Sequence, residues 1–259
     1  MKILILGAGK MGAFFADLLS FEHEIAVLEK EPKRMRFIYN ALRLQSPEEI
    51  KDFSPELVIN CVSLNSTIDA FRQVFPYLTP NCIISDIASV KTQLKDFYAT
   101  CGFPYVSTHP MFGPTFANMT NPTEENTIII SESDYIGKIF FKDLFIKLKL
   151  NIFEYTFEEH DEIVAYSLGI PFASTLVFAS VMVHQEAPGT TFKRHKEIAR
   201  GLLSEDDYLL TEILFNPRTP DQITRIQEEL SELQEIIKAK DVVKMKVFLD
   251  GIRKKLGAF

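Results

Sequence analysis

A single histidine, His109, stands between a strand-like run and a rigid turn in the segment STHPMFGP, residues 107–114. Proteins with alternating strands and helices often hold a reactive side chain in a loop that proline and glycine fix at the edge of a sheet. Histidine titrates closer to neutrality than other side chains, so it suits proton transfer. His109 is therefore the leading candidate for an acid–base residue. The alternative is a turn histidine that packs against Pro110.

A glycine-rich segment near the N-terminus, GAGKMG at residues 7–12, matches the pattern G-x-G-x-x-G between an apolar run and a helical pattern. The first glycine of this pattern permits a tight turn, the second lets a pyrophosphate approach the backbone, and the third lets helix and strand pack closely. The helix N-terminus would offer N–H groups to the phosphates. The segment predicts a dinucleotide site, the alternative being a structural glycine turn. The expected contacts are Gly7, Gly9, Lys10, Met11 and Gly12.

An acidic residue, Glu29, ends the second apolar run. A carboxylate at this place can accept hydrogen bonds from the ribose hydroxyls of adenosine, and it would repel a 2′-phosphate. NAD is therefore the expected cofactor, in preference to NADP, although the neighbouring Lys30 and Arg34 weaken that preference. Val62 and Ser63, at the end of a third strand-like run, are expected to contact the same cofactor.

A polar segment, DIASVK at residues 86–91, follows the fourth strand-like run. Doubly wound folds place ligand contacts at the carboxyl ends of their strands. Ser89 in this segment has two interpretations. Its hydroxyl could bind a substrate hydroxyl or orient an imidazole, or it could cap a helix that begins near Val90.

Short apolar runs alternate with helical patterns in the first part of the chain, which predicts a doubly wound, Rossmann-type parallel sheet with both faces covered. Helical patterns alone follow, so we expect a dinucleotide-binding domain over residues 1–155 and a helical substrate and dimerisation domain over residues 156–259. The strand-like runs are residues 2–6, 24–29, 57–62, 82–85, 104–107, 127–130 and 151–155. The later helices are expected at 157–185, 191–203, 205–216, 220–239 and 241–256.

The overall composition is that of a globular protein, with 46% hydrophobic and 24% charged residues among 259. A net charge of −7 argues against a nucleic-acid partner, which usually needs a basic face. The three cysteines lack disulfide or metal-ligand spacing, so we expect reduced thiols, no metal site and a cytoplasmic protein. The N-terminal apolar run is too short for a signal peptide.

One uncharged segment, Ile163–Val183, is long enough to span a bilayer. Gly169 and Pro171 interrupt it, and acidic residues flank it without an adjacent lysine or arginine. A helix that is apolar all round can instead be buried inside a helical domain. We therefore expect a buried helix at a subunit interface, and a homodimer that shares the helical layer.

Three segments together, the glycine-rich turn, D-x-x-S-V-K and H-P-M-F-G-P, resemble the prephenate/arogenate dehydrogenase family of tyrosine biosynthesis. The resemblance covers nearly the whole chain in domain order and depends mostly on the narrow H-P-M-F-G-P motif. It implies NAD-dependent oxidation of prephenate, with loss of carbon dioxide, to 4-hydroxyphenylpyruvate. It also implies that His109 bonds to the ring hydroxyl of the substrate and that Ser89 supports this contact.

The two carboxylates of prephenate imply cationic anchors in the helical half. Arg194 and Arg200 are the candidates, the alternative being a solvated helix face. His160 matches the His-Asp pair that opens the first long helix in the family, either as a substrate contact or as a helix-start residue. The family's Ser-His-x-Pro-His segment reads LGIPF here at residues 168–172, which leaves prephenate and arogenate both open. Another two-domain hydroxyacid dehydrogenase or reductase, and a non-catalytic NAD-binding protein, are further alternatives.

Overall fold

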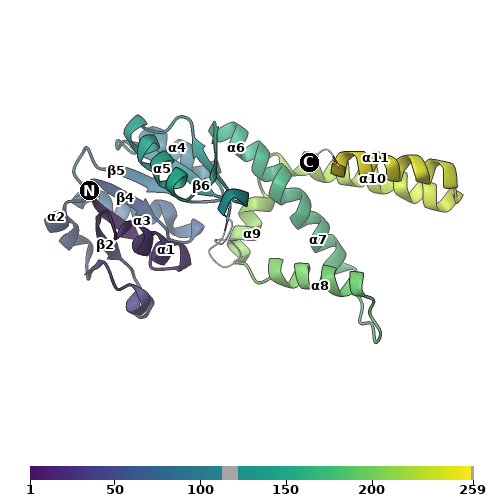
Figure 1. Cartoon of the computed structure of the whole chain (residues 1–259), viewed down its shortest axis with the longest axis horizontal. Coiled ribbons are helices and arrows are strands. Elements are labelled where there is room, and N and C mark those ends of the chain that lie inside the picture. The colour runs from purple at the N-terminus through teal and green to yellow at the C-terminus, as the bar shows by residue number, and fades with distance from the viewer. Residues whose placement is uncertain (113–121, 258–259) are drawn as a thin grey trace. The chain divides into compact units, whose positions relative to one another are not determined.

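The computed structural model describes residues 1–112 and 122–257, so Gly113 and Pro114 of the histidine motif lie outside the described residues. The chain forms two compact units, Met1–Val164 and Ala165–Phe259. Figure 1 shows a sheet with helices in the first unit and helices in the second. The Rossmann-type fold class predicted from the sequence is confirmed.

An eight-stranded sheet with the order β3-β2-β1-β4-β5-β6-β7-β8 forms the centre of the first unit. Seven of its strands coincide with the predicted runs. The eighth, β3, was not predicted, because three residues around the charged Arg43 are too few to show a pattern. The strands are β1 (Lys2–Leu6), β2 (Glu24–Leu28), β3 (Leu42–Leu44), β4 (Leu57–Asn60), β5 (Ile83–Asp86), β6 (Tyr105–Pro110), β7 (Asn126–Ile130) and β8 (Asn151–Tyr155).

One strand pair departs from the parallel arrangement predicted from the sequence. β7 runs antiparallel to β6, with His109 opposite Ile128, whereas the other neighbouring strands pair in parallel. A parallel neighbour requires a crossover, usually a helix, whereas an antiparallel neighbour requires only a return loop. The described part of the β6–β7 connection contains a short 3₁₀ turn, Pro122–Glu124. Apolar runs do not encode strand direction, which is why the sequence pattern missed this pair.

Helices cover both faces of the sheet, and the alternation of side chains along β1 decides which face each residue meets. Ile3 and Ile5 belong to a core cluster with Phe15, while Leu4 and Leu6 belong to the cluster on the opposite face. The first cluster is completed by helices α1 (Lys10–Leu19) and α5 (Tyr135–Lys147), and the second by α3 (Thr67–Val74) and α4 (Thr92–Thr100). A short helix, α2 (Ile50–Phe53), precedes β4.

Helix α6 (Phe157–Val164) belongs to the first unit, so the units divide nine residues beyond the expected boundary at 155. The physical reason is that Phe157 is buried in the second core cluster, and α6 packs against α4, β7 and β8. The helical pattern starts where it was expected, but its first two turns complete the sheet domain.

The second unit consists of helices in the part that the structure describes. A π-helical turn, Ala165–Gly169, interrupts the long helix expected at 157–185. Pro220 lies in the first turn of α10, as the sequence predicted. The helices are α7 (Ile170–Ser180), α8 (Thr190–Leu202), α9 (Asp207–Leu214), α10 (Thr219–Ala239) and α11 (Val242–Gly257).

The apolar helical segment is not buried within a single chain, and its expected burial at a subunit interface stays a prediction. Among the described residues, α7 has no buried residue, and Val177 and Val181 are 61% and 72% exposed. Phe157–Ser180, with a mean hydropathy of 1.6, is a helical segment long and apolar enough to cross a membrane by length and composition. A helix buried in the core of a protein assembly can have the same length and hydropathy.

Candidate functional site

The glycine-rich loop between β1 and α1 has the geometry that the G-x-G-x-x-G pattern requires. Gly7 has a φ of +92°, a left-handed conformation that side chains with a Cβ rarely adopt. A Cβ on Gly12 would lie 2.0 Å from the carbonyl oxygen of Gly7, so this position requires glycine for close packing. A Cβ on Gly9 would meet nothing within 4 Å. That open space is where the pattern predicts that a phosphate approaches the backbone.

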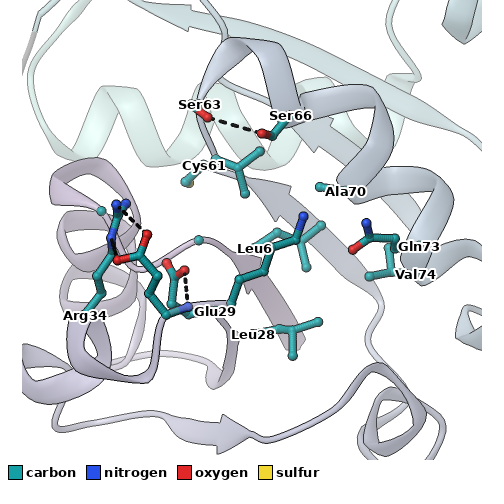
Figure 2. Close-up of a pocket in the computed structure, with 15 residues that line it drawn as sticks. Leu6, Leu28, Glu29, Arg34, Cys61, Ser63, Ser66, Ala70, Gln73 and Val74 are labelled. Carbon is teal, nitrogen blue, oxygen red and sulfur yellow. Dashed lines mark hydrogen bonds and ion pairs between the residues drawn. The ribbon is translucent and has the colours of Figure 1, made fainter. Parts of the chain in front are cut away.

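A cavity of about 310 Å³ lies beside this loop, and Figure 2 shows the residues around it. Gly7, Gly9, Glu29, Val62 and Ser63 all line it, so the structure brings together five of the eight residues predicted to bind the cofactor. The cavity lies at the carboxyl ends of β1, β2 and β4, where doubly wound folds bind nucleotides. Of the other three, Gly12 packs under the loop, Lys10 lines a neighbouring cavity, and Met11 packs against the first core cluster.

Glu29 also makes contacts within the chain that the sequence did not predict. Its Oε2 accepts a hydrogen bond from the backbone N–H of Ala8 at 2.7 Å, and its Oε1 accepts one from the N–H of Glu31 at 2.9 Å. The carboxylate therefore joins the glycine-rich loop to the turn after β2.

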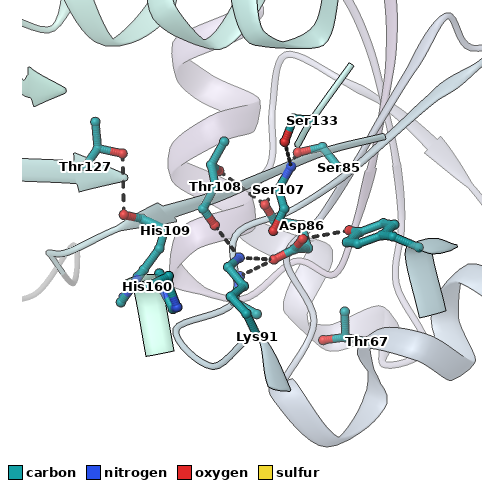
Figure 3. A network of polar contacts seen from close by, with 12 residues as sticks. Thr67, Ser85, Asp86, Lys91, Ser107, Thr108, His109, Thr127, Ser133 and His160 are labelled. Atoms are coloured by element: carbon teal, nitrogen blue, oxygen red, sulfur yellow. Dashed lines mark hydrogen bonds and ion pairs between the residues drawn. The ribbon is translucent and has the colours of Figure 1, made fainter. Parts of the chain in front are cut away.

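His109 lies in the last part of β6 and is 6% exposed. Its Nδ1 is 3.0 Å from Nε2 of His160, which projects from α6 and is fully buried (Figure 3). The Thr127 hydroxyl donates to the carbonyl oxygen of His109 at 3.5 Å. The structure thus joins two predicted site residues that lie 51 positions apart, and it places His160 in the first turn of α6.

Burial and neighbouring charges keep both imidazoles neutral. Burial lowers the pKa of His109 well below its usual value, and His160 and the Lys91 ammonium lower it further. Burial and Lys91 lower the pKa of His160 to about 3, against the opposing effect of Asp86. A neutral imidazole can accept a proton, so His109 is in the form that a general base requires.

A buried polar network, which the sequence did not predict, underlies the histidine pair. Lys91, which is fully buried, forms an ion pair with Asp86 and donates to the carbonyl oxygen of Thr108 at 2.7 Å. The Tyr98 hydroxyl donates to the other carboxylate oxygen of Asp86 at 2.6 Å. This network fixes the end of β5 to β6 next to His109 (Figure 3). The available signal was a pair of opposite charges, Asp86 and Lys91, at the end of an apolar strand.

The remaining predicted site residues occupy different places. Ser89 is half-buried in the loop between β5 and α4, and the N-cap of α4 is Lys91, so Ser89 is not the helix cap. Arg194 and Arg200 both lie on α8 in the second unit and are exposed. Arg200 lines a cavity of about 390 Å³ in that unit and pairs with Glu197 at 2.6 Å. Arg194 is not among the residues that line it.

Comparison with known proteins agrees with this geometry. The family model for the prephenate dehydrogenase nucleotide-binding domain matches residues 29–137. These residues lie within the first unit and make up most of it. The resemblance inferred from the three sequence motifs is thereby confirmed.

Two curated relatives share parts of the chain. A protein of Methanocaldococcus jannaschii named a probable arogenate/prephenate dehydrogenase is 23% identical over 204 residues, which are 72% of this chain and 44% of the relative. The T-protein of Haemophilus influenzae is 30% identical over 123 residues, 46% of this chain and 29% of the relative. The chain therefore spans less than half the length of these two relatives.

Solved structures share the fold over the whole chain. Prephenate dehydrogenase from A. aeolicus, in complex with hydroxyphenyl propionate and NAD+, has a TM-score of 0.84 at 19% identity, over 100% of this chain and 98% of that one. Arogenate dehydrogenase from Synechocystis has a TM-score of 0.74 at 18% identity, over 99% and 100%. At these identities the likeness shows the fold, and both units share it with members of the prephenate dehydrogenase family.

Proposed function

We propose that this protein is an NAD-dependent dehydrogenase that oxidises prephenate and releases carbon dioxide, giving 4-hydroxyphenylpyruvate. The main support is the position of a buried, neutral His109 on the same sheet as the glycine-rich loop. β1, β4, β5 and β6 pair in parallel, so their carboxyl ends meet at one edge. Gly7 follows β1 and His109 lies near the end of β6, so both belong to this edge.

The contacts of His109 favour the tautomer that a base needs. Nδ1 of His160 is 3.4 Å from Oδ1 of Asp161, whose pKa burial raises to about 6. At neutral pH this carboxylate is ionised, so it accepts a hydrogen bond from Nδ1–H of His160. Nε2 of His160 is then an acceptor, and it accepts from Nδ1–H of His109. Nε2 of His109 therefore carries no proton, and its lone pair is available to accept one.

The reaction balances with this arrangement. Nε2 of His109 accepts the proton of the ring hydroxyl as the carbon–oxygen bond becomes a carbonyl. NAD+ at the glycine-rich loop would accept the hydride that leaves the ring carbon bearing this hydroxyl. The ring carboxylate departs as carbon dioxide, its bonding electrons complete the aromatic ring, and the proton held by His109 returns to the carbonyl oxygen to give the phenol. Ser89, in the loop after β5, is proposed to support the hydroxyl contact.

The two carboxylates of the substrate need cationic partners, for which we propose Arg194 and Arg200. Both lie on α8, but they are six positions apart and project from different sides of the helix. Arg200 shares its side with Lys193 and Lys196, which line the same cavity. The density of positive charge on this side of α8 makes Arg200 the better supported anchor.

A cytoplasmic homodimer is the assembly that best explains the second unit. α11 has no buried residue, and Val243 and Val247 are about 70% exposed. Contiguous apolar surface of this kind usually marks an interaction site. Light scattering of the purified protein without detergent should give twice the chain mass of 29.6 kDa. A monomer, or a protein that is extracted only with detergent, would contradict this proposal.

The function is tested by incubating the purified protein with NAD+ and either prephenate or arogenate. Prephenate should give NADH, carbon dioxide and 4-hydroxyphenylpyruvate in equal amounts, whereas arogenate would give tyrosine. If the protein turns over arogenate and not prephenate, the substrate is arogenate and the proposed oxidation with loss of carbon dioxide still holds. Binding of NAD+ without reduction in the presence of either substrate would refute the proposed activity and favour a non-catalytic NAD-binding protein.

A further inference from the structure

The acid–base site holds a histidine that its own surroundings make hard to protonate. His109 and His160 are 6% and 0% exposed, and the Lys91 ammonium acts on both rings. An imidazolium at either place would lose its hydration and face a positive charge, so the pKa of each histidine lies below its usual range. A general base works best when its pKa lies near the working pH. A proton that stays on the rings as an extra charge is therefore unfavourable here.

Asp161, the residue after His160 on α6, has the opposite tendency. Its side chain is 22% exposed, and its Oδ1 lies 3.4 Å from Nδ1 of His160. Burial disfavours the ionised carboxylate and raises its pKa to about 6, against the opposing effect of the Lys91 ammonium. Of the three groups, Asp161 therefore takes up a proton most readily.

Two hydrogen bonds connect the reacting nitrogen to this carboxylate. Nδ1 of His109 is 3.0 Å from Nε2 of His160 (Figure 3), and Nδ1 of His160 faces Asp161. An imidazole that gains a proton on one nitrogen can release the proton of its other nitrogen and stay neutral. A proton gained at Nε2 of His109 can therefore be compensated, ring by ring, as far as Asp161.

We propose that His109, His160 and Asp161 act as one base, in which a proton taken up at Nε2 of His109 neutralises Asp161. The substrate O–H bond breaks as the Nε2–H bond of His109 forms. The Nδ1 proton of His109 moves to Nε2 of His160, and the Nδ1 proton of His160 moves to Oδ1 of Asp161. The reverse shifts return the proton to the carbonyl oxygen. The proposal rests on the proposed function, since it concerns the same His109.

Burial reverses the order of proton affinities found in the Ser-His-Asp triad, where the carboxylate stays ionised while the histidine becomes charged. Here both rings are buried beside Lys91, and the raised pKa of Asp161 shows that its ionised form is itself disfavoured. The Asp86 carboxylate raises the pKa of His160, but by less than burial and Lys91 lower it. The neutral end state of the chain is therefore Asp161–H with two neutral rings.

The charges around Asp161 allow its titration to be separated from that of His109. From α4, the Thr92 hydroxyl and the Lys95 ammonium lower the pKa of Asp161, as Lys91 does, whereas Glu158 on α6 raises it. Lys95 and Glu158 pair with each other and are more than half exposed. The pKa of His109 responds instead to burial, His160 and Lys91.

Steady-state turnover of prephenate between about pH 5 and pH 8 tests the proposal. In the wild type, kcat/KM should fall with the uptake of one proton near pH 6. Lys95→Gln should move this midpoint to higher pH and Glu158→Gln to lower pH, each by about 0.2 to 0.7 pH unit, the effect of one exposed charge. The rate above about pH 7 should stay within about twofold of the wild type.

Lys147→Gln and Glu22→Gln are matched controls, because this ion pair is similarly exposed but joins α5 to the turn after α1. Both should leave the midpoint unchanged. A midpoint that does not move in Lys95→Gln and Glu158→Gln would overturn the proposal, because the titrating group would then not be Asp161.

Nitrogen-15 NMR of labelled histidines reads the protonation of each ring nitrogen without turnover, and the spectrum of His109→Asn identifies the His109 signals. Nε2 of His109 should carry no proton at about pH 7.5 and one proton at about pH 5. Nδ1 should change in the opposite sense, so that the ring stays neutral. An imidazolium at the lower pH, or a ring that does not change, would overturn the proposal.

Asp161→Asn removes the end of the chain, because an amide does not take up the proton. The His109 ring of this variant should not change over the same pH range, and kcat should fall by about 10²-fold or more. Asp161→Glu should recover part of the rate and the pH response. A normal rate in Asp161→Asn would overturn the proposal. Absence of prephenate oxidation by the wild type at every pH would instead refute the proposed function, whereas the NMR spectra test the proton chain by themselves.

Discussion

The histidine pair makes a specific prediction about acid stability. His109 and His160 are buried and neutral in the folded protein, and burial is the first cause of the lowered pKa of each. In the unfolded chain both groups regain a pKa of about 6.5 and take up protons below it. Their folded-state pKa values are depressed, so their stabilising contribution is complete above about pH 6.5 and is lost as the pH falls toward the folded values. Acidification should therefore destabilise the wild-type protein.

The magnitude follows from proton linkage. Each pH unit between the unfolded and folded pKa values changes the free energy of unfolding by about 1.4 kcal/mol for each group. Between about pH 7.5 and pH 5, His160, with a folded pKa of about 3, accounts for a loss of about 2 kcal/mol, and the lowered pKa of His109 adds a loss in the same direction. Asp161 acts in the opposite direction, because burial raises its pKa to about 6, and it offsets about 1 kcal/mol. His160 and Asp161 together predict a net loss of about 1 kcal/mol, and the lowered pKa of His109 makes this loss larger.

The assay is urea unfolding followed by circular dichroism at both pH values, for the wild type and for His109→Gln/His160→Gln. The double variant lacks the two imidazoles but keeps Asp161 and all other titrating groups. Its change in unfolding free energy with pH should differ from that of the wild type by more than about 2 kcal/mol, because the contribution of His109 adds to that of His160. An identical pH dependence in the two proteins would refute the claim that both histidines are buried and neutral.

Three further predictions concern the loop and the network beside the histidines. Gly12→Ala should lower the free energy of unfolding by at least about 3 kcal/mol in a thermal unfolding experiment, because its Cβ would clash with the loop backbone. The free energy of unfolding of Gly9→Ala should lie within about 0.5 kcal/mol of the wild-type value. Gly9→Ala should nevertheless lose at least tenfold in NAD+ affinity by calorimetry, and unchanged affinity would contradict the assigned phosphate approach. Lys91→Met should cost about 3–5 kcal/mol in urea unfolding, since it leaves the Asp86 carboxylate buried without its cation, and Tyr98→Phe about 1.5–3 kcal/mol. A larger loss of stability for Tyr98→Phe than for Lys91→Met would show that the buried Asp86 carboxylate is stabilised mainly by the Tyr98 hydroxyl.

The parts of the fold that depend on local pattern were predictable from the sequence. Strands such as β4 and β5 are buried along their whole length and read as continuous apolar runs. The glycine-rich loop was predictable because its steric requirements fall on single residues. The direction of β7 was not, because pairing direction depends on the connection and not on side-chain periodicity.

The site was predictable only in part, because its contacts join distant segments. His109 was identified from its proline- and glycine-rich surroundings. His160 stands in the acidic sequence FEEHDE, which is typical of an exposed helix start, yet α6 turns this residue into the core beside His109. Lys91 likewise reads as a surface cation, and only the fold shows that it is buried beside Asp86 and the carbonyl oxygen of Thr108.

The central claim is that His109 accepts the substrate proton, and turnover by His109→Asn tests it most directly. Prephenate-dependent NADH formation should fall by about 10²- to 10⁴-fold, the contribution typical of a general base. NAD+ affinity, measured on the same preparation by calorimetry, should remain within about twofold, because His109 is not among the residues that line the nucleotide cavity. Near-normal turnover with normal NAD+ binding would contradict the account.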